Sequence, residues 1–380
     1  MRKKMTFAIC IGLLAAALTG CWDIHYLTKK KIINGISLDA SEDGQVAAAV
    51  RTLILDSKGS GQFEVKDQLI QATGDSVLHI GSIMDSMLPG TIEATKTHVF
   101  IIGEELAKRG VMSTLEFFYR DPKGYLTSNI LISKGLASEV LAIKSAENSP
   151  AAYSIKQMVE GAVAKTIIPE QTLFTLWSQM TAPGVDTVLP VIHKTKNKAL
   201  VVDNIGLFDG SRYSGVTLSR DESMMLLLLM NKLNKRVLLD IPMNQSSNER
   251  DTDEAAAKMI TFQVRKEKRT MDVSVDKNTQ QIECAVKVDL YGDISSYPTD
   301  EGGKVDRGRL KKELAEALNI RASNTANKLL NANCDALGIG RKLRVSHPEL
   351  WKSIDWKNEY KDVKLKTSVQ VHIRSTGVIS

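Results

Sequence analysis

Apolar and polar residues alternate most regularly in the last third of the 380-residue chain. Four segments there place mostly hydrophobic side chains on every second position: Ile260, Phe262 and Val264; Met271, Val273 and Val275; Ile282, Cys284, Val286, Val288 and Leu290; and Val363, Leu365, Thr367, Val369, Val371 and Ile373. A period of two is typical of strands that bury one face. Because short polar connectors join the first three segments, we expect them to form a three-stranded antiparallel meander.

A helical period follows this predicted meander. Residues 306–337 carry one apolar stripe, formed by Leu310, Leu314, Leu318, Ala322, Ala326, Leu329 and Leu337. Gly338 is suited to cap the end of this helix, and Pro348 stands near the first turn of a shorter helix after it. The last third is therefore predicted to be an α+β layer, in which a long helix covers the dry face of an antiparallel sheet.

Strand and helix patterns alternate through the rest of the chain. Apolar runs predict strands over residues 31–38, 45–55, 97–103, 126–135 and 200–209, and helical spacing predicts helices over residues 65–87, 104–121, 151–180 and 219–233. Residues 182–200, which contain two prolines, and the polar residues 241–255 are predicted to be loops. Strands that alternate with helices are typical of α/β units.

The fold class that follows is α+β, in a multidomain mixed α/β chain. We expect an N-terminal α/β domain over residues 21–198, in one part or two, and a C-terminal α+β domain over residues 199–380. The helix over residues 219–233 is expected to be capped by Ser219 or Asp221. It contains four consecutive leucines, and an all-apolar helix is more typical of a core between layers than of a partner-binding surface.

The first twenty residues have the pattern of a signal peptide. Basic residues at positions 2–4 precede an apolar run over residues 5–18, which at about 14 residues is short for a transmembrane helix of about 20. The sequence Leu18-Thr19-Gly20-Cys21 is similar to a bacterial lipobox. It predicts cleavage between Gly20 and Cys21, with a diacylglyceryl group on the Cys21 sulfur and an acylated amino terminus. The alternative is an ordinary signal peptide with an incidental cysteine.

A lipid-modified Cys21 would make membrane lipid the first predicted partner. Two acyl chains hold a protein stably at a bilayer, whereas one holds it marginally. No flexible Gly/Ser tether follows the cysteine. The candidate membrane-proximal residues are Trp22, Tyr26, Lys29, Lys30 and Lys31. The aromatic pair suits the headgroup layer, and each lysine would gain about 1 kcal/mol near anionic lipid. Equally open is that Trp22 packs on its own domain and the lysines are simply solvated.

Charge and side-chain chemistry exclude other classes of function. The net charge of +6 falls to +3 once the three basic residues at positions 2–4 leave with the signal, and the remaining basic residues are scattered. Nucleic acid is therefore not an expected partner. The six histidines show no metal-ligand spacing, and the chain has no phosphate-binding loop and no nucleophile elbow. We predict no catalytic residue, no metal and no cofactor. Cys284 and Cys334 are expected to face one core, either as a disulfide or as two inert thiols.

Several segments, taken in order, resemble the Ger(x)C family, the lipoprotein C subunits of spore germinant receptors. They are Cys21-Trp22-Asp23, the sequence NGISLD ending at Asp39, and residues 97–110, 117–124, 204–223, 338–360 and 371–379. The chain departs from the family after Asp23, where the family usually has an acidic and an aliphatic residue. Here Ile24-His25-Tyr26-Leu27 follows, so contacts made by that acid are not expected.

The resemblance implies a role that residue chemistry alone does not supply. Such proteins are anchored at the outer face of the inner spore membrane, where they join a membrane-embedded A subunit and a transporter-like B subunit. The complex senses nutrients, and the family fold of three α/β domains implies no catalytic site. Whether nutrient touches this chain stays open. The rival function is a substrate-binding lipoprotein of a transporter, against which the stiff linker and the antiparallel carboxyl-terminal layer argue. A surface hydrolase would need a nucleophile–base pair that we do not find.

Overall fold

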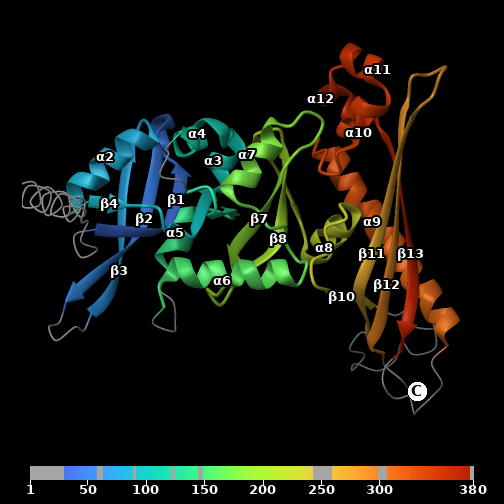
Figure 1. Cartoon of the computed structure of the whole chain (residues 1–380), viewed down its shortest axis with the longest axis horizontal. Coiled ribbons are helices and arrows are strands. Elements are labelled where there is room, and N and C mark those ends of the chain that lie inside the picture. Colours follow the sequence, from blue (N-terminus) through green and yellow to red (C-terminus); the bar gives the residue numbers. More distant parts are fainter. Residues whose placement is uncertain are drawn as a thin grey trace, which may run out of the picture.

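The computed structural model describes residues 30–57, 63–88, 91–120, 125–143, 149–242, 259–297 and 306–376. Two sheets follow one another along the long axis of the molecule, with helix α8 between them (Figure 1). Residues 243–258, which include most of the predicted polar loop, lie outside the described part of the chain.

Within the described residues the first sheet has nine strands, in the order β3-β2-β1-β5-β6-β7-β8-β9, with the short β4 beside β1. The strands are β1 (Lys30–Ala40), β2 (Val46–Ser57), β3 (Phe63–Gly74), β4 (Thr91–Glu93), β5 (Val99–Gly103), β6 (Asn129–Ser133), β7 (Val188–Lys194), β8 (Leu200–Asp209) and β9 (Arg212–Leu218). The centre, β1-β5-β6-β7, is parallel, and antiparallel strands extend it on both sides. We predicted a domain boundary at residue 198. The first sheet continues past this residue into β8 and β9, and the boundary itself stays a prediction.

Helices cover both faces of this sheet. One face packs against α2 (Val77–Met87), α3 (Glu104–Arg109), α4 (Met112–Arg120) and α7 (Leu173–Thr181), and the other against α5 (Ala137–Ala142) and α6 (Ala151–Ala164) (Figure 1). Alternate residues of the central strands supply the two cores: Phe100 and Ile102 face the first set, while Val99 and Ile101 face the second. The parallel strands are therefore apolar throughout, as expected for strands buried on both faces.

The predicted helix over residues 65–87 is wrong in its first half. Residues 63–74 form β3, which pairs antiparallel with β2 along its whole length, and α2 begins at Val77. The apparent helical spacing joined Leu69, a strand residue, to Ile80 and Met84, which belong to α2. Ser76 separates the two elements because its side chain accepts a hydrogen bond from the His79 N–H, which caps the helix.

Two further segments differ from expectation. Residues 188–194, predicted to be loop, form β7. Pro190 fits there because the described pairing of β7 with β6 begins only at Val191, after the residue that lacks an N–H. The single helix predicted over residues 104–121 is two helices, since Gly110 between them has a φ of 117° that ends α3.

The second sheet has the order β10-β11-β12-β13, with β10 (Val237–Pro242), β11 (Met259–Val275), β12 (Ile282–Ser296) and β13 (Lys364–Ser375). The predicted three-stranded meander over residues 260–290 is wrong, because residues 259–275 are one strand. The register shifts between Val264 and Lys266, and such a bulge adds one residue to the strand. The core-facing positions change from even numbers, which are buried, to odd numbers such as Met271 and Val273, which are partly buried. One long strand therefore has the sequence pattern of two.

β13 runs parallel to β12, and α9 (Arg307–Asn331) connects them across one face of the sheet. The long helix is confirmed, but it ends at Asn331. Gly338 precedes α10 (Ile339–Ser346) with a φ of 74° and does not cap α9. Pro348 begins α11 (Pro348–Ser353) as predicted, and the short α12 (Trp356–Glu359) precedes the last strand.

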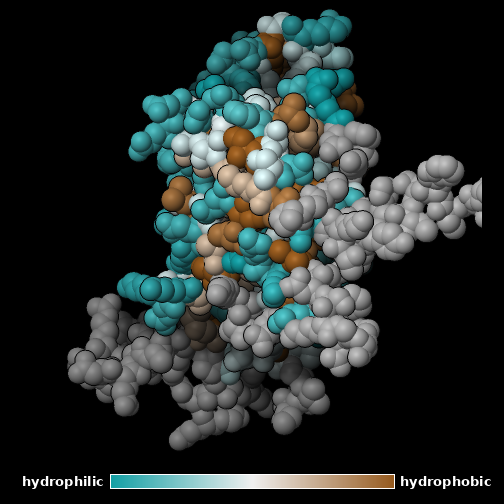
Figure 2. Space-filling view, turned by 90° about the vertical axis from the view of Figure 1, so that its left-hand side faces the viewer, coloured by the Kyte–Doolittle hydropathy of each residue, from teal (hydrophilic) through white to brown (hydrophobic). Residues whose placement is uncertain are grey.

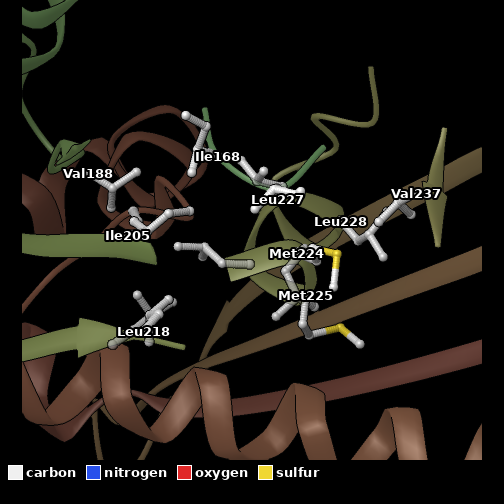
Figure 3. Packing of buried hydrophobic residues seen from close by; sticks show 14 of the residues in the cluster. Ile168, Val188, Ile205, Leu218, Met224, Met225, Leu227, Leu228 and Val237 are labelled. Atoms are coloured by element: carbon white, nitrogen blue, oxygen red, sulfur yellow. The ribbon is translucent and has the colours of Figure 1, made fainter. Parts of the chain in front are cut away.

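Helix α8 (Arg220–Leu229) joins the two sheets into one core. Ser219 caps it in a reciprocal box with Glu222, and the four leucines 226–229 are buried. Figure 3 shows Met224, Leu227 and Leu228 among residues of the first sheet, such as Ile205, and Val237 of the second. The leucine run is therefore core, as the all-apolar pattern favours.

Candidate functional site

The predicted anchor lies outside the described residues. This holds for Gly20, Cys21, Trp22, Tyr26 and Lys29, which the structure does not describe. Lys30 is the first residue of β1, and Lys31, also in β1, is 9% exposed, so most of its side chain is covered by protein. Among the helices of the described part of the chain, none is long and apolar enough to cross a bilayer.

The two cysteines of the described chain are free, buried thiols. Burial raises the pKa of Cys284 to about 12, and it also raises the pKa of the fully buried Cys334. Thiols with such pKa values are protonated at neutral pH and are poor nucleophiles. They correspond to the inert-thiol alternative. In the described residues, no group of three His, Cys, Asp or Glu side chains is placed to hold a metal ion.

The family-like segment that ends at Asp39 has a structural role. Asp39 is buried, and its carboxylate accepts hydrogen bonds from the N–H groups of Ala137 (2.7 Å) and Ser138 (2.9 Å) at the start of α5. Arg51 donates to the carbonyls of Leu141 and Ala142 at the end of the same helix, at 2.8 Å each. A six-residue helix is thus held by an anion at its amino end and a cation at its carboxyl end.

Two glycines make this arrangement compact. A Cβ atom added to Gly103 would fall on the Asp39 carboxylate, and one added to Gly35 would lie 2.7 Å from the Ala152 Cβ. Neither position has room for a side chain. The pattern that resembles the family at residues 35–39 and 97–103 therefore reflects close packing of strands against α5 and α6.

The segment over residues 338–360 closes a second junction, between the first sheet and the carboxyl-terminal helices. Asp335, with no exposed surface, accepts hydrogen bonds from the Ile339 and Gly340 N–H groups (2.8 Å each) and from Trp356 Nε1 (3.1 Å). Its own N–H donates to Asp186 at 2.8 Å. Burial raises the pKa of Asp335 to about 7, and the three N–H donors oppose that rise.

An apolar hollow opens on the outer surface of the first sheet. We name it the α2–α4 groove; its lining includes Ile36, Leu38 and Val50 of the sheet, Ile80 and Met84 of α2, and Phe118 of α4, and its volume is about 550 Å³. At its rim Leu78 is 65% exposed. Figure 2, which views the end of the molecule where α2 lies, shows hydrophobic side chains gathered on this face. Exposed apolar hollows of this size are typical of binding surfaces.

A second hollow, the aromatic pocket, lies beside α4 and α7. It has a volume of about 350 Å³ and is lined by Glu116, Tyr119, Arg120, Leu126, Phe174 and Trp177. The rings of Tyr119 and Trp177 lie 4.5 Å apart, while Phe174 is 64% exposed. Aromatic and arginine side chains are enriched where proteins bind one another.

Sequence reasoning did not find either hollow. For the aromatic pocket a signal existed, since Phe174 and Trp177 are three residues apart and project from one side of α7, away from the buried Leu173 and Leu176. The α2–α4 groove left no local signal, because its lining comes from strands β1, β2 and β4 and helices α2 and α4, which are separate segments of the sequence.

Comparison with known proteins identifies the family. A model described as the spore germination protein N-terminal domain matches residues 23–194, and one described as spore germination B3/GerAC-like, C-terminal, matches residues 203–377. Spore germination protein KC of Bacillus subtilis (strain 168) is 22% identical, over 100% of this chain and 97% of that protein. Spore germination protein GerQC of Bacillus cereus is 21% identical, over 100% and 99%.

A solved structure shows the same fold. The crystal structure of the GerBC protein matches 93% of this chain and 100% of its own, with a TM-score of 0.58 and 18% identity. That likeness agrees with the mixed α+β architecture of two sheets described above. Since the two family domains follow each other along nearly the whole sequence, the chain belongs to the Ger(x)C family of spore germination proteins.

Proposed function

We propose that this protein is the lipid-anchored C subunit of a nutrient germinant receptor, on the outer face of the inner spore membrane. The observation that carries the proposal is the ordered match of both germination domains, which begins two residues after Cys21. The lipobox-like Leu18-Thr19-Gly20-Cys21 supplies the anchor. Its diacylglyceryl group would hold the body at the bilayer, within reach of the membrane-embedded A and B subunits.

The subunit acts by contact with its neighbours and not by catalysis. Two exposed hollows, the α2–α4 groove and the aromatic pocket, support this role because each offers apolar surface that a partner could bury. The buried thiols have pKa values too high for nucleophilic chemistry. Against the rival, a substrate-binding lipoprotein, stands the packing of α8, which fills the space between the two sheets with leucine and methionine side chains. A transporter-type binding protein would need a ligand cleft between lobes.

The anchor is tested by Cys21→Ala, with Cys10→Ala in the apolar part of the signal as the matched control. We expect the Cys21 variant to fold but to be lost from, or misplaced at, the membrane, and the Cys10 variant to behave like the unchanged protein. Mass spectrometry of the mature amino terminus should find the diacylglyceryl group only when Cys21 is present. Membrane retention of Cys21→Ala equal to that of the control would refute the anchor.

The receptor role is tested separately by deleting the gene. Spores should lose the response to one class of nutrient, while a trigger that does not use nutrients still germinates them. Normal germination with every nutrient contradicts the proposal. Calorimetry of the purified chain with amino acids and sugars addresses the rival, since tight binding by the chain alone would favour the substrate-binding lipoprotein.

A further inference from the structure

The α2–α4 groove lies beside the point where the described chain begins. β1 starts at Lys30, and its first three residues pair with β4 at Thr91–Glu93. Ile33, one residue after that pairing, and Ile92 of β4 both line the groove. In Figure 1, α2 and β4 lie at the same end of the sheet as β1. Whatever precedes Lys30 therefore joins the domain next to this hollow.

The groove has the shape and chemistry to take an apolar segment. Its floor is the sheet face over Leu38 and Val50, both buried, and Ile80 and Met84 of α2 form a buried wall. Leu78 of α2 and Phe117 of α4 also line the groove, and Leu78 is 65% exposed. Water in such a hollow has few polar partners, so its release on binding is favourable.

We propose that residues 22–27 of this chain dock in the α2–α4 groove. Trp22, Ile24 and Tyr26 alternate with Asp23 and His25. In an extended segment alternate side chains point to opposite sides, so the three apolar residues would enter the groove while the two polar ones face water. The sequence of this segment thus matches a one-sided apolar hollow.

Reach and local concentration favour this occupant over a separate partner. Trp22 precedes Lys30 by eight residues, which span at most about 28 Å when extended. A segment joined to the rim by so short a connection has an effective concentration of about millimolar or more, whatever the concentration of other molecules. The inference therefore does not depend on lipid at Cys21 or on the receptor role.

Docking would determine the orientation of the folded domain at the membrane. If residues 22–27 are held in the groove, Cys21 would be held next to the first sheet. The distance and the orientation between this sheet and the group attached to Cys21 would then be restricted. A free segment of the same length would let the body drift by tens of ångströms. Of the two alternatives left open by the sequence, this selects packing of Trp22 on its own domain.

The test is disulfide trapping in the full chain, in membranes of the expressing cell. Ile24→Cys, at a position that would enter the groove, is combined with Gly81→Cys, which lines the groove, or with His79→Cys on the same helix. Gly81 has open space for a side chain, and two residues turn an α-helix by about 200°, so position 79 faces away from position 81. Cys284 and Cys334 are buried, and peptide mapping by mass spectrometry identifies the bridge formed.

We expect the bridge to position 81 to form about tenfold faster than the bridge to position 79 under mild oxidation, because docking raises the local concentration on one side of the helix. Adding Trp22→Ala and Tyr26→Ala should reduce the rate at position 81 to the rate at position 79, whereas Trp22→Phe should keep most of it. Equal rates at positions 79 and 81 overturn the proposal. So does a rate at position 81 that the alanine substitutions leave unchanged.

Discussion

Asn319 on α9 closes the outer edge of the second sheet at Val369. β13 has β12 on one side, and on the other side the Asn319 amide takes the place of a strand. Its Nδ2 donates to the Val369 carbonyl, and its Oδ1 accepts from the Val369 N–H, both at 2.9 Å. Val369 is 2% exposed, so water does not readily replace the amide. Substituting Asn319→Ala would leave one buried N–H and one buried carbonyl without a partner.

The cost follows from these contacts. A buried polar group that loses its partner costs about 1–3 kcal/mol, so the two groups together cost about 2–6 kcal/mol. Alanine regains about 0.5 kcal/mol of helix propensity over asparagine. We expect the second sheet to lose about 1.5–5.5 kcal/mol of local stability.

Amide hydrogen exchange measures this loss at the site. If the sheet opens more easily by about 2 kcal/mol, the Val369 amide should exchange about 30-fold faster, since each 1.4 kcal/mol is a factor of ten. Asn324→Ala is the matched control, because Asn324 lies on the same helix and is exposed. It should change stability by less than about 0.5 kcal/mol. Equal exchange at Val369 in the two variants would refute the role given to the Asn319 amide.

Other parts of the fold make further predictions. Gly103→Ala should destabilise the first sheet, because the new methyl group falls on the Asp39 carboxylate, whereas Gly161→Ala, in a helix with open space, should stabilise by about 1 kcal/mol; urea midpoints that move alike would contradict this. Because the folded pKa of Asp335 is about 7 and its usual value is 3.8, the folded state keeps a proton that the unfolded state releases, so stability falls as pH rises from about 4 to 7. Asp335→Asn should flatten that slope in thermal melts between pH 4 and 7, and an unchanged slope would mean that other groups cause it. Trp177→Ala should leave the melting temperature nearly unchanged, since the side chain is partly exposed, but weaken the nutrient response; a full response would remove the aromatic pocket as a contact surface.

The sequence determined by itself those features that depend on local periodicity or on a short motif. The α9 stripe, the Ser219 cap, the burial of the four leucines and the alternation in β12 and β13 all appear in the structure as expected. Each of these patterns places apolar side chains on one face of a helix or strand. That face must be buried, whichever element packs against it. The lipobox-like motif at Cys21 and the ordered family segments are likewise readable without coordinates.

Only the tertiary structure determined which strands pair with one another. Residues 63–74 are a strand because β2 offers an edge along their whole length, and residues 188–194 are a strand because β6 and β8 flank them. Because of the bulge after Val264, one long strand has the sequence pattern of two strands. The α2–α4 groove exists only once strands β1, β2 and β4 meet helices α2 and α4. Hydrogen-bond partners and hollows arise between segments that are far apart in the chain, so no local pattern carries them.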